Sequence, residues 1–208
     1  MLPVRLWNMV EEKIAEVNVE DTIAYRTAFI IKFVYMTGLR LEEITNVRLG
    51  DFFAVEKDNG QQSWRLKMLG KGSKTREVFL VESGMKMVSD YLKVKGLPTD
   101  PRLSDKSIPL ITHLQSLDAL SKNHLYTTIK DWFKQLAEPL KDTQPMDYQL
   151  LSSVSTHWLW HTFASRLVKK AELPILMKML GHSNLQTTSV YVNTEDEEGE
   201  KAMESVFG

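Results

Sequence analysis

Four clusters of residues combine side chains that could act on a phosphate ester. The first, at residues 37–43, reads TGLRLEE and places Arg40 after a glycine break, at the start of an expected helix. There the planar guanidinium could face a phosphate beside free backbone N–H groups. Gly-x-Arg is also common at ordinary helix starts, so this cluster alone is only a weak indication of a phosphate site.

The second cluster, at residues 70–76, reads GKGSKTR and forms an expected hairpin turn. Glycines on both sides of Lys71 allow the turn to approach a ligand closely, so that the lysine can deliver a proton or a positive charge. The segment from Arg65 to Arg76 contains several lysines and arginines and no acid. An ordinary basic surface turn explains the same pattern.

The third and fourth clusters supply histidines and a tyrosine. Residues 157–164 read HWLWHTFA, and residues 180–191 read LGHSNLQTTSVY. His157 and His161 share a helix face and could bind a metal, but the acid between them that marks a zinc protease helix is missing. Tyr191 in a short helix would usually be a packing residue. It gains interest because a histidine, a lysine and an arginine could converge with it.

The elements that must position these clusters are mostly helices. Helices are expected at 4–18, 21–36, 82–94, 122–137, 156–170, 174–180 and 185–192, and another from Leu41. In the second of them, apolar residues recur mostly at three- and four-residue steps, which indicates one buried face. Two strands, Ser63–Met68 and Thr75–Leu80, flank the hairpin, whereas 97–109 and 139–155 are expected to be irregular. The pattern predicts a mainly α fold with a small antiparallel β-sheet.

Composition narrows the function classes. The 208 residues carry 26 Lys and Arg against 27 Asp and Glu, a net charge of −1, which lacks the strong basic signature of a DNA-binding domain. Acids crowd the C-terminal segment 195–200, so the rest of the chain is mildly basic. The absence of cysteine excludes disulfides, thiolate metal sites and cysteine nucleophiles. No apolar run reaches membrane-spanning length and no signal segment is seen, so a cytoplasmic protein with no membrane partner is expected.

Taken in order, the four clusters resemble the sequence boxes of the tyrosine recombinases, the phage integrase family. Those boxes read TGLRxxE, GKGxKxR, HxLRHxFA and LGHxxxxTTxxY. The matches run from Thr37 to Tyr191, about three quarters of the chain, with the spacing inside each box retained. The resemblance implies the tyrosine-recombinase catalytic fold of the DNA breaking–rejoining enzymes. It also implies site-specific DNA recombination or integration, by strand cleavage and rejoining.

The resemblance assigns a role to each box. Tyr191 would attack the scissile phosphate and form a 3′-phosphotyrosine link. Arg40 would clamp the phosphoryl oxygens as negative charge develops. Lys71 would protonate the departing 5′ oxygen, His157 would assist proton transfer, and His182 would hydrogen-bond the phosphate.

Other residues would support this site. Glu43 is expected to hold the site together through its hydrogen bonds, and Lys67, Lys74 and Arg76 are expected to contact DNA. Neither a cofactor nor a metal is expected.

One box departs from the pattern, because Trp160 stands where the family carries a second arginine. An indole offers one N–H donor and no charge, so it cannot rebuild a bidentate phosphate clamp. Losing a comparable donor costs on the order of 10²–10³ in rate. Two alternatives therefore stay open: a weak or inactive DNA-binding or regulatory descendant, and, with a poorer match to the last box, a type IB topoisomerase.

The resemblance also implies an organisation. Residues 1–193 are expected to form the catalytic domain, and residues 194–208 a C-terminal tail that is exchanged between protomers or folds back. The N-terminal DNA-clamping domain of integrases is expected to be absent from the chain. Duplex DNA is the expected partner, with a homo-oligomer of up to four copies assembled on it.

Overall fold

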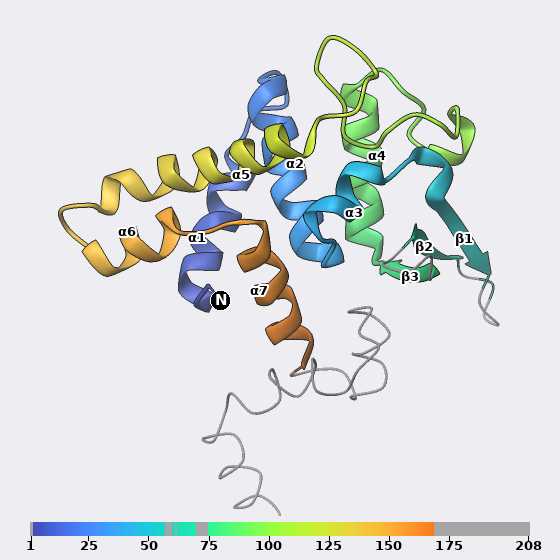
Figure 1. The fold of residues 1–208 in the computed structure, drawn as a ribbon. Coiled ribbons are helices and arrows are strands. Elements are labelled where there is room, and N and C mark those ends of the chain that lie inside the picture. Colours follow the sequence, from blue (N-terminus) through green and yellow to red (C-terminus); the bar gives the residue numbers. More distant parts are fainter. Residues whose placement is uncertain (1, 57–59, 61, 70–74, 169–208) are drawn as a thin grey trace, which may run out of the picture. The chain divides into compact units, whose positions relative to one another are not determined.

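Helices make up most of the part of the chain that the computed structural model describes, which is residues 2–56, 60, 62–69 and 75–168. The chain divides into two units, Met1–Phe163 and Ala164–Gly208. The helices are α1 (Val4–Ala15), α2 (Thr22–Thr37), α3 (Leu41–Asn46), α4 (Glu82–Val94), α5 (Lys122–Ala137), α6 (Pro145–Ser152) and α7 (Thr156–Val168) (Figure 1). The predicted class, mainly α with a small antiparallel sheet, is confirmed.

The sheet has three antiparallel strands in the order β1 (Phe52–Glu56), β2 (Gln62–Leu69) and β3 (Thr75–Leu80). Leu66 pairs with Phe52 on one side and with Val78 on the other, and all three side chains are buried. The sequence predicted only the β2–β3 pair. It missed β1, a five-residue strand that directly follows a short 3₁₀ turn at Leu49–Asp51.

Helix α2 is the centre of the core. Asp21 caps its start by accepting a hydrogen bond of 3.0 Å from the Ala24 N–H, and Gly38 ends it in the left-handed conformation. The expected single buried face is too narrow a description, since Phe29, Ile30 and Ile31 are all buried in succession. The reason is that α2 contacts both α4 and α5, and a helix enclosed on several sides is apolar around most of its circumference.

The prediction that residues 139–155 are irregular is wrong. Residues 139–155 contain the 3₁₀ turn Glu138–Leu140 in part and the helix α6. Pro145 does not break this helix but begins it, at a position where the missing N–H costs no hydrogen bond. The helices predicted at 174–180 and 185–192, and the tail 194–208, lie outside the described residues.

The start of the chain is tied to α7. The backbone N–H of Leu2 donates a hydrogen bond of 3.1 Å to the Thr162 hydroxyl, which in turn donates one of 2.8 Å to the Trp158 carbonyl. Leu2 and Thr162 are both buried. Helix α7, which carries the third sequence box, is therefore held by the backbone at Leu2, 160 residues away in the sequence.

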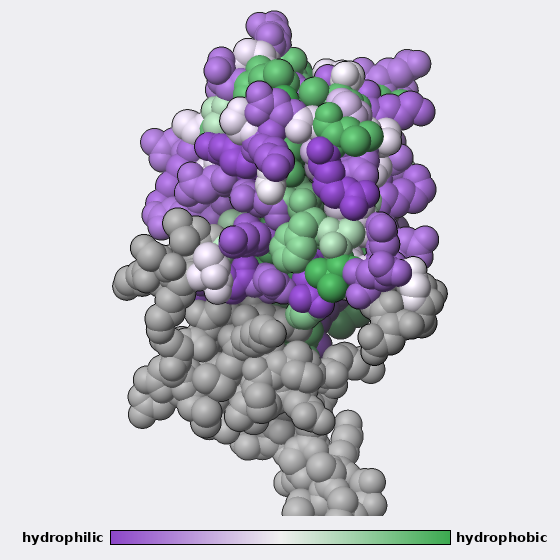
Figure 2. All heavy atoms as spheres, turned by 90° about the vertical axis from the view of Figure 1, so that its right-hand side faces the viewer, coloured by the Kyte–Doolittle hydropathy of each residue, from purple (hydrophilic) through white to green (hydrophobic). Residues whose placement is uncertain are grey.

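On the face shown in Figure 2, polar side chains predominate and apolar ones form only small areas among them. None of the helices among the described residues has both the length and the apolar character needed to cross a membrane.

Candidate active site

The glycine of the first box sets the approach of that box to α7. Gly38 has φ 60°, and a Cβ built there would lie 2.3 Å from the Phe163 ring. Only glycine combines that backbone conformation with so close a contact. The turn after α2 therefore presses on α7 and delivers Arg40 at the start of α3, as the sequence predicted.

Glu43 joins the two arginines nearest to it. Its Oε2 accepts hydrogen bonds of 2.8 Å from the Arg40 backbone N–H and from the Arg76 guanidinium. Its Oε1 lies 3.7 Å from the Arg40 guanidinium. The Glu43 and Arg76 side chains are 9% and 8% exposed, whereas Arg40 is 46% exposed. The carboxylate thus holds the Arg40 backbone while the Arg40 guanidinium stays open to solvent.

Arg76 lies inside the domain and not on the expected DNA-contacting surface, because its guanidinium pairs with the buried Glu43. The sequence carried a signal for this. Arg76, Val78 and Leu80 alternate along β3, so they share the strand face that points to the core. The positive charge of the segment masked that alternation. Lys67, by contrast, is exposed on β2.

Trp160 is a buried residue of α7 that lies at the site. It is 6% exposed, and the Arg40 guanidinium lies over its ring, 5.2 Å from the centroid. Its ring is nearly parallel to that of His157, at 8° and 6.1 Å between centroids. A cation over an indole face is attracted by the ring quadrupole, worth about 0.5–2 kcal/mol. Trp160 therefore contacts both the expected phosphate clamp and the expected proton-transfer group.

His157 and His161, the two histidines of the third box, are hydrogen-bonded to each other, with 2.7 Å between their Nε2 atoms. Such a bond requires one of these nitrogens to be unprotonated. Burial, followed by the neighbouring His157, lowers the pKa of His161 below its ordinary value. His157 itself is exposed. Among the described residues no group of three or more His, Asp or Glu side chains could hold a metal ion.

The structure thus brings together residues from three places in the sequence: Arg40 and Glu43 from the first box, Arg76 from the end of the second, and His157 and Trp160 from the third. Lys71, Lys74, His182 and Tyr191, the remaining predicted site residues, lie outside the described residues. The assembled part is a half-exposed guanidinium and an exposed imidazole that both lie against the buried Trp160 indole, with a buried ion pair behind the guanidinium. That arrangement can bind an anion at Arg40 and exchange a proton at His157.

Comparison with known proteins identifies the family of the chain. The family model for the phage integrase family matches residues 5–198. The chain belongs to the phage integrase family. This member is 25% identical over 184 residues to the tyrosine recombinase XerC of Vibrio vulnificus, covering 88% of the chain and 51% of the relative. It is 28% identical over 188 residues to XerC of Caldanaerobacter subterraneus, covering 89% and 46%. The chain spans about half the length of these relatives.

Solved structures of integrase-family proteins share the fold. The XerH site-specific recombinase bound to palindromic difH substrate superposes with a TM-score of 0.69 at 22% identity, over 97% of this chain and 51% of that one. The XerA recombinase gives 0.64 at 18% identity, over 100% and 65%. The predicted tyrosine-recombinase catalytic fold is confirmed.

Proposed function

We propose that this phage integrase family member is a site-specific recombinase that cleaves and rejoins duplex DNA through a 3′-phosphotyrosine on Tyr191. One observation carries the proposal. The half-exposed Arg40 guanidinium lies over the Trp160 indole, whose ring is nearly parallel to that of the exposed His157, while Glu43 is occupied by the Arg40 backbone and by Arg76. A guanidinium fully neutralised by its own carboxylate would be a poor phosphate clamp. Here the Glu43 carboxylate positions Arg40 without covering it.

The chemistry follows from these residues. The Tyr191 oxygen attacks phosphorus, the bond from phosphorus to the 5′ oxygen breaks, and Lys71 gives that oxygen a proton. Arg40 and His182 stabilise the charge on the non-bridging oxygens, and His157 assists proton transfer from the tyrosine. Attack by the 5′ hydroxyl of a second strand reverses the steps and releases Tyr191. Because the phosphotyrosine keeps the bond energy, neither a nucleotide nor a metal is required.

Duplex DNA is the proposed partner. Lys67 is exposed on β2, and Lys74 directly precedes β3 in the sequence, so both are proposed to contact backbone phosphates. A chain with a net charge of −1 can neutralise few phosphates, so we expect weak binding that falls steeply with salt. Recombination of two duplexes needs several active sites, and we propose that up to four copies assemble on DNA, with residues 194–208 exchanged between them.

A second candidate function is favoured by Trp160. The indole fills the position of the expected second arginine and is 6% exposed, so it leaves that side of the phosphate without a charged donor. A member with this change could bind recombination sites and regulate an intact relative without cutting DNA.

A nicked suicide substrate separates the two candidates. The nick lets the cleaved fragment diffuse away, so any covalent protein–DNA adduct accumulates and can be seen after denaturing electrophoresis. We expect a slow adduct from the parent chain and none from Tyr191→Phe, which lacks the nucleophilic oxygen. Gel-shift titration at two salt concentrations is run on the same proteins.

Each outcome has a distinct meaning. An adduct that depends on Tyr191 supports the recombinase. Salt-sensitive DNA binding without any adduct supports the regulatory descendant and rejects strand transfer by this chain. Binding that is indifferent to salt, with no adduct, rejects both functions.

A further inference from the structure

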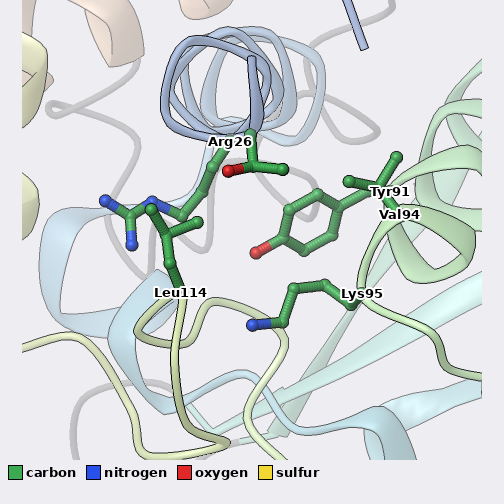
Figure 3. Close-up of a pocket in the computed structure, with 6 residues that line it drawn as sticks. Arg26, Tyr91, Val94, Lys95 and Leu114 are labelled. Carbon is green, nitrogen blue, oxygen red and sulfur yellow. The ribbon is translucent and has the colours of Figure 1, made fainter. Parts of the chain in front are cut away.

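A pocket of about 120 Å³ lies between α2, α4 and the loop that follows Thr112, far from Arg40. Roughly 16 Å of helix axis separates Arg26, near the start of α2, from Thr37 at its end, at 1.5 Å per residue. The pocket has room for several water molecules. Its lining consists of Thr22, Arg26, Tyr91, Val94, Lys95 and Leu114 (Figure 3).

Arg26 is the unusual member of this lining. It is 6% exposed, and one of its terminal nitrogens donates a hydrogen bond of 3.2 Å to the Thr112 carbonyl. Its Nε is buried without a hydrogen-bond partner among the described residues. None of the ion pairs in the described part of the chain includes Arg26. Fully buried arginines are normally paired, because an uncompensated charge is costly away from water.

A second cation lies close by. The Lys95 amino group donates a hydrogen bond of 2.8 Å to the His113 carbonyl, which uses one of its three donors. Burial, followed by the charge of Arg26, lowers the pKa of Lys95. The described carboxylates make no ion pair with either cation. The pocket therefore holds two positive charges that repel each other.

Tyr91 completes the donor set. Its ring stacks on Phe29 at 3.9 Å between centroids, and its side chain is 1% exposed. Burial raises the pKa of Tyr91 to about 12, so the hydroxyl remains protonated at neutral pH. In Figure 3 the Tyr91 hydroxyl and the Lys95 amino group point into the space beside Leu114. The pocket thus presents donors and cations but no acid.

A purely structural account explains only part of this arrangement. Arg26 and Lys95 each fix one carbonyl of the 112–113 loop, which accounts for one donor of each. These two hydrogen bonds do not explain why the Arg26 Nε is buried without a hydrogen-bond partner among the described residues. Nor do they balance the two positive charges. A bound anion would satisfy both, since a guanidinium and an ammonium are the usual partners of phosphate oxygens.

We propose that this pocket binds a phosphate group between Arg26 and Lys95, with the Tyr91 hydroxyl as a third donor. Two cations match the charge of free phosphate near neutral pH better than the single charge of a DNA phosphodiester. The same chemistry could nevertheless come from either source, free phosphate or the DNA backbone. The site is independent of the strand-transfer residues and does not rest on the proposed recombinase function.

The test compares three proteins: the parent chain, Lys95→Met, and Lys93→Met as the matched control. Lys93 lies two residues away on α4 and is exposed. Melting temperature is measured against sodium phosphate and against sodium chloride at equal ionic strength. Because a ligand that binds only the folded state raises the melting temperature with its concentration, the midpoint of the rise reports affinity. The general effect of phosphate on protein surfaces acts on all three proteins alike.

We expect the parent and Lys93→Met to show the same phosphate-specific rise, and Lys95→Met to need at least about tenfold more phosphate, the equivalent of one lost charged contact. Lys95 is partly exposed, so its replacement should leave the fold intact. Arg26→Lys, which keeps the charge but loses the fork, should weaken phosphate binding as well if it folds. Equal midpoints in the parent and Lys95→Met, or no rise beyond that in chloride, would overturn the proposal.

Duplex DNA distinguishes the two sources. If a backbone phosphate occupies the pocket, saturating DNA abolishes the phosphate-dependent rise. Lys95→Met then also lowers the salt slope of DNA binding by about one. If free phosphate is the ligand, the rise persists with DNA bound and the salt slope is unchanged. Either result supports an anion site and identifies its occupant.

Discussion

Arg76 and Glu43 form an ion pair of 2.8 Å in which both side chains are less than a tenth exposed. Replacing Arg76 with Gln leaves the Glu43 charge buried without that partner, and such a loss costs about 3–5 kcal/mol. We expect Arg76→Gln to lower the free energy of unfolding by that amount. Urea denaturation followed by circular dichroism measures it.

The sheet supplies a matched control for this prediction. Arg65 and Glu77 form a similar pair at 2.7 Å, but these side chains are 27% and 39% exposed. Exposed pairs contribute about 0–1 kcal/mol, so Arg65→Gln should be close to neutral. Equal costs for the two variants would show that the Arg76 pair gains nothing from its burial.

Trp160→Arg tests whether the indole is the single defect of the site. An arginine there restores a charged donor, and we expect phosphotyrosine formation on the suicide substrate to rise on the order of 10²–10³. The new charge would also lie beside the Arg40 guanidinium, which now rests on the indole. The free protein should therefore melt at a lower temperature, and DNA should stabilise it more than it stabilises the parent. A variant that folds, binds DNA and forms no adduct would contradict the single-defect account.

Gly38→Ala should disturb the contact between Gly38 of the first box and Phe163 of the third. The left-handed backbone costs alanine roughly 1–2 kcal/mol, and the new Cβ would overlap the Phe163 ring, adding about 1–3 kcal/mol. Gly96→Ala isolates the backbone cost, because Gly96 has φ 69° and no atom within 4 Å of an added Cβ, so the difference between the two variants measures the overlap with Phe163. We expect the Gly38 variant to be the less stable of the two in urea. Similar stability would mean that the Phe163 ring moves aside freely.

The histidine pair predicts a pH dependence. The pKa of His161 is lowered in the folded state by burial and then by His157, so the unfolded chain binds the proton more readily. The stability that neutral His161 contributes is therefore present above its unfolded pKa, about 6.5, and is lost as pH falls through the folded pKa. Replacing His161 with Gln should flatten the decline in stability below about pH 6.5. A parallel decline in both proteins, measured by urea unfolding at several pH values, would assign the effect to other groups.

The sequence predicted the parts of the site that short spacings encode. Arg40 follows Gly38 by two residues, and His157 and Trp160 share one helix, so local structure alone fixes their relation within each box. Whether the Arg76 side chain is buried depends on which face of β3 packs on the core. Its positive charge suggested the exposed face, whereas the structure places it on the buried face. Helix α6 lies in the segment 139–155 that was expected to be irregular, and its Pro145 stands in the first turn, where a proline fits a helix.

The hydrogen bond from Leu2 to Thr162 joins residues 160 positions apart. At roughly 5–20 residues per second, a ribosome adds Thr162 about 8–30 s after Leu2. Throughout that interval the amide of Leu2 lacks its final partner. The contact of Arg40 with Trp160 is delayed as well, because positions 40 and 160 are 120 residues apart, about 6–24 s at the same rate. The nascent chain therefore cannot form the contact of Arg40 with the indole before Trp160 is added, so shorter translation products would present Arg40 without the indole beneath it.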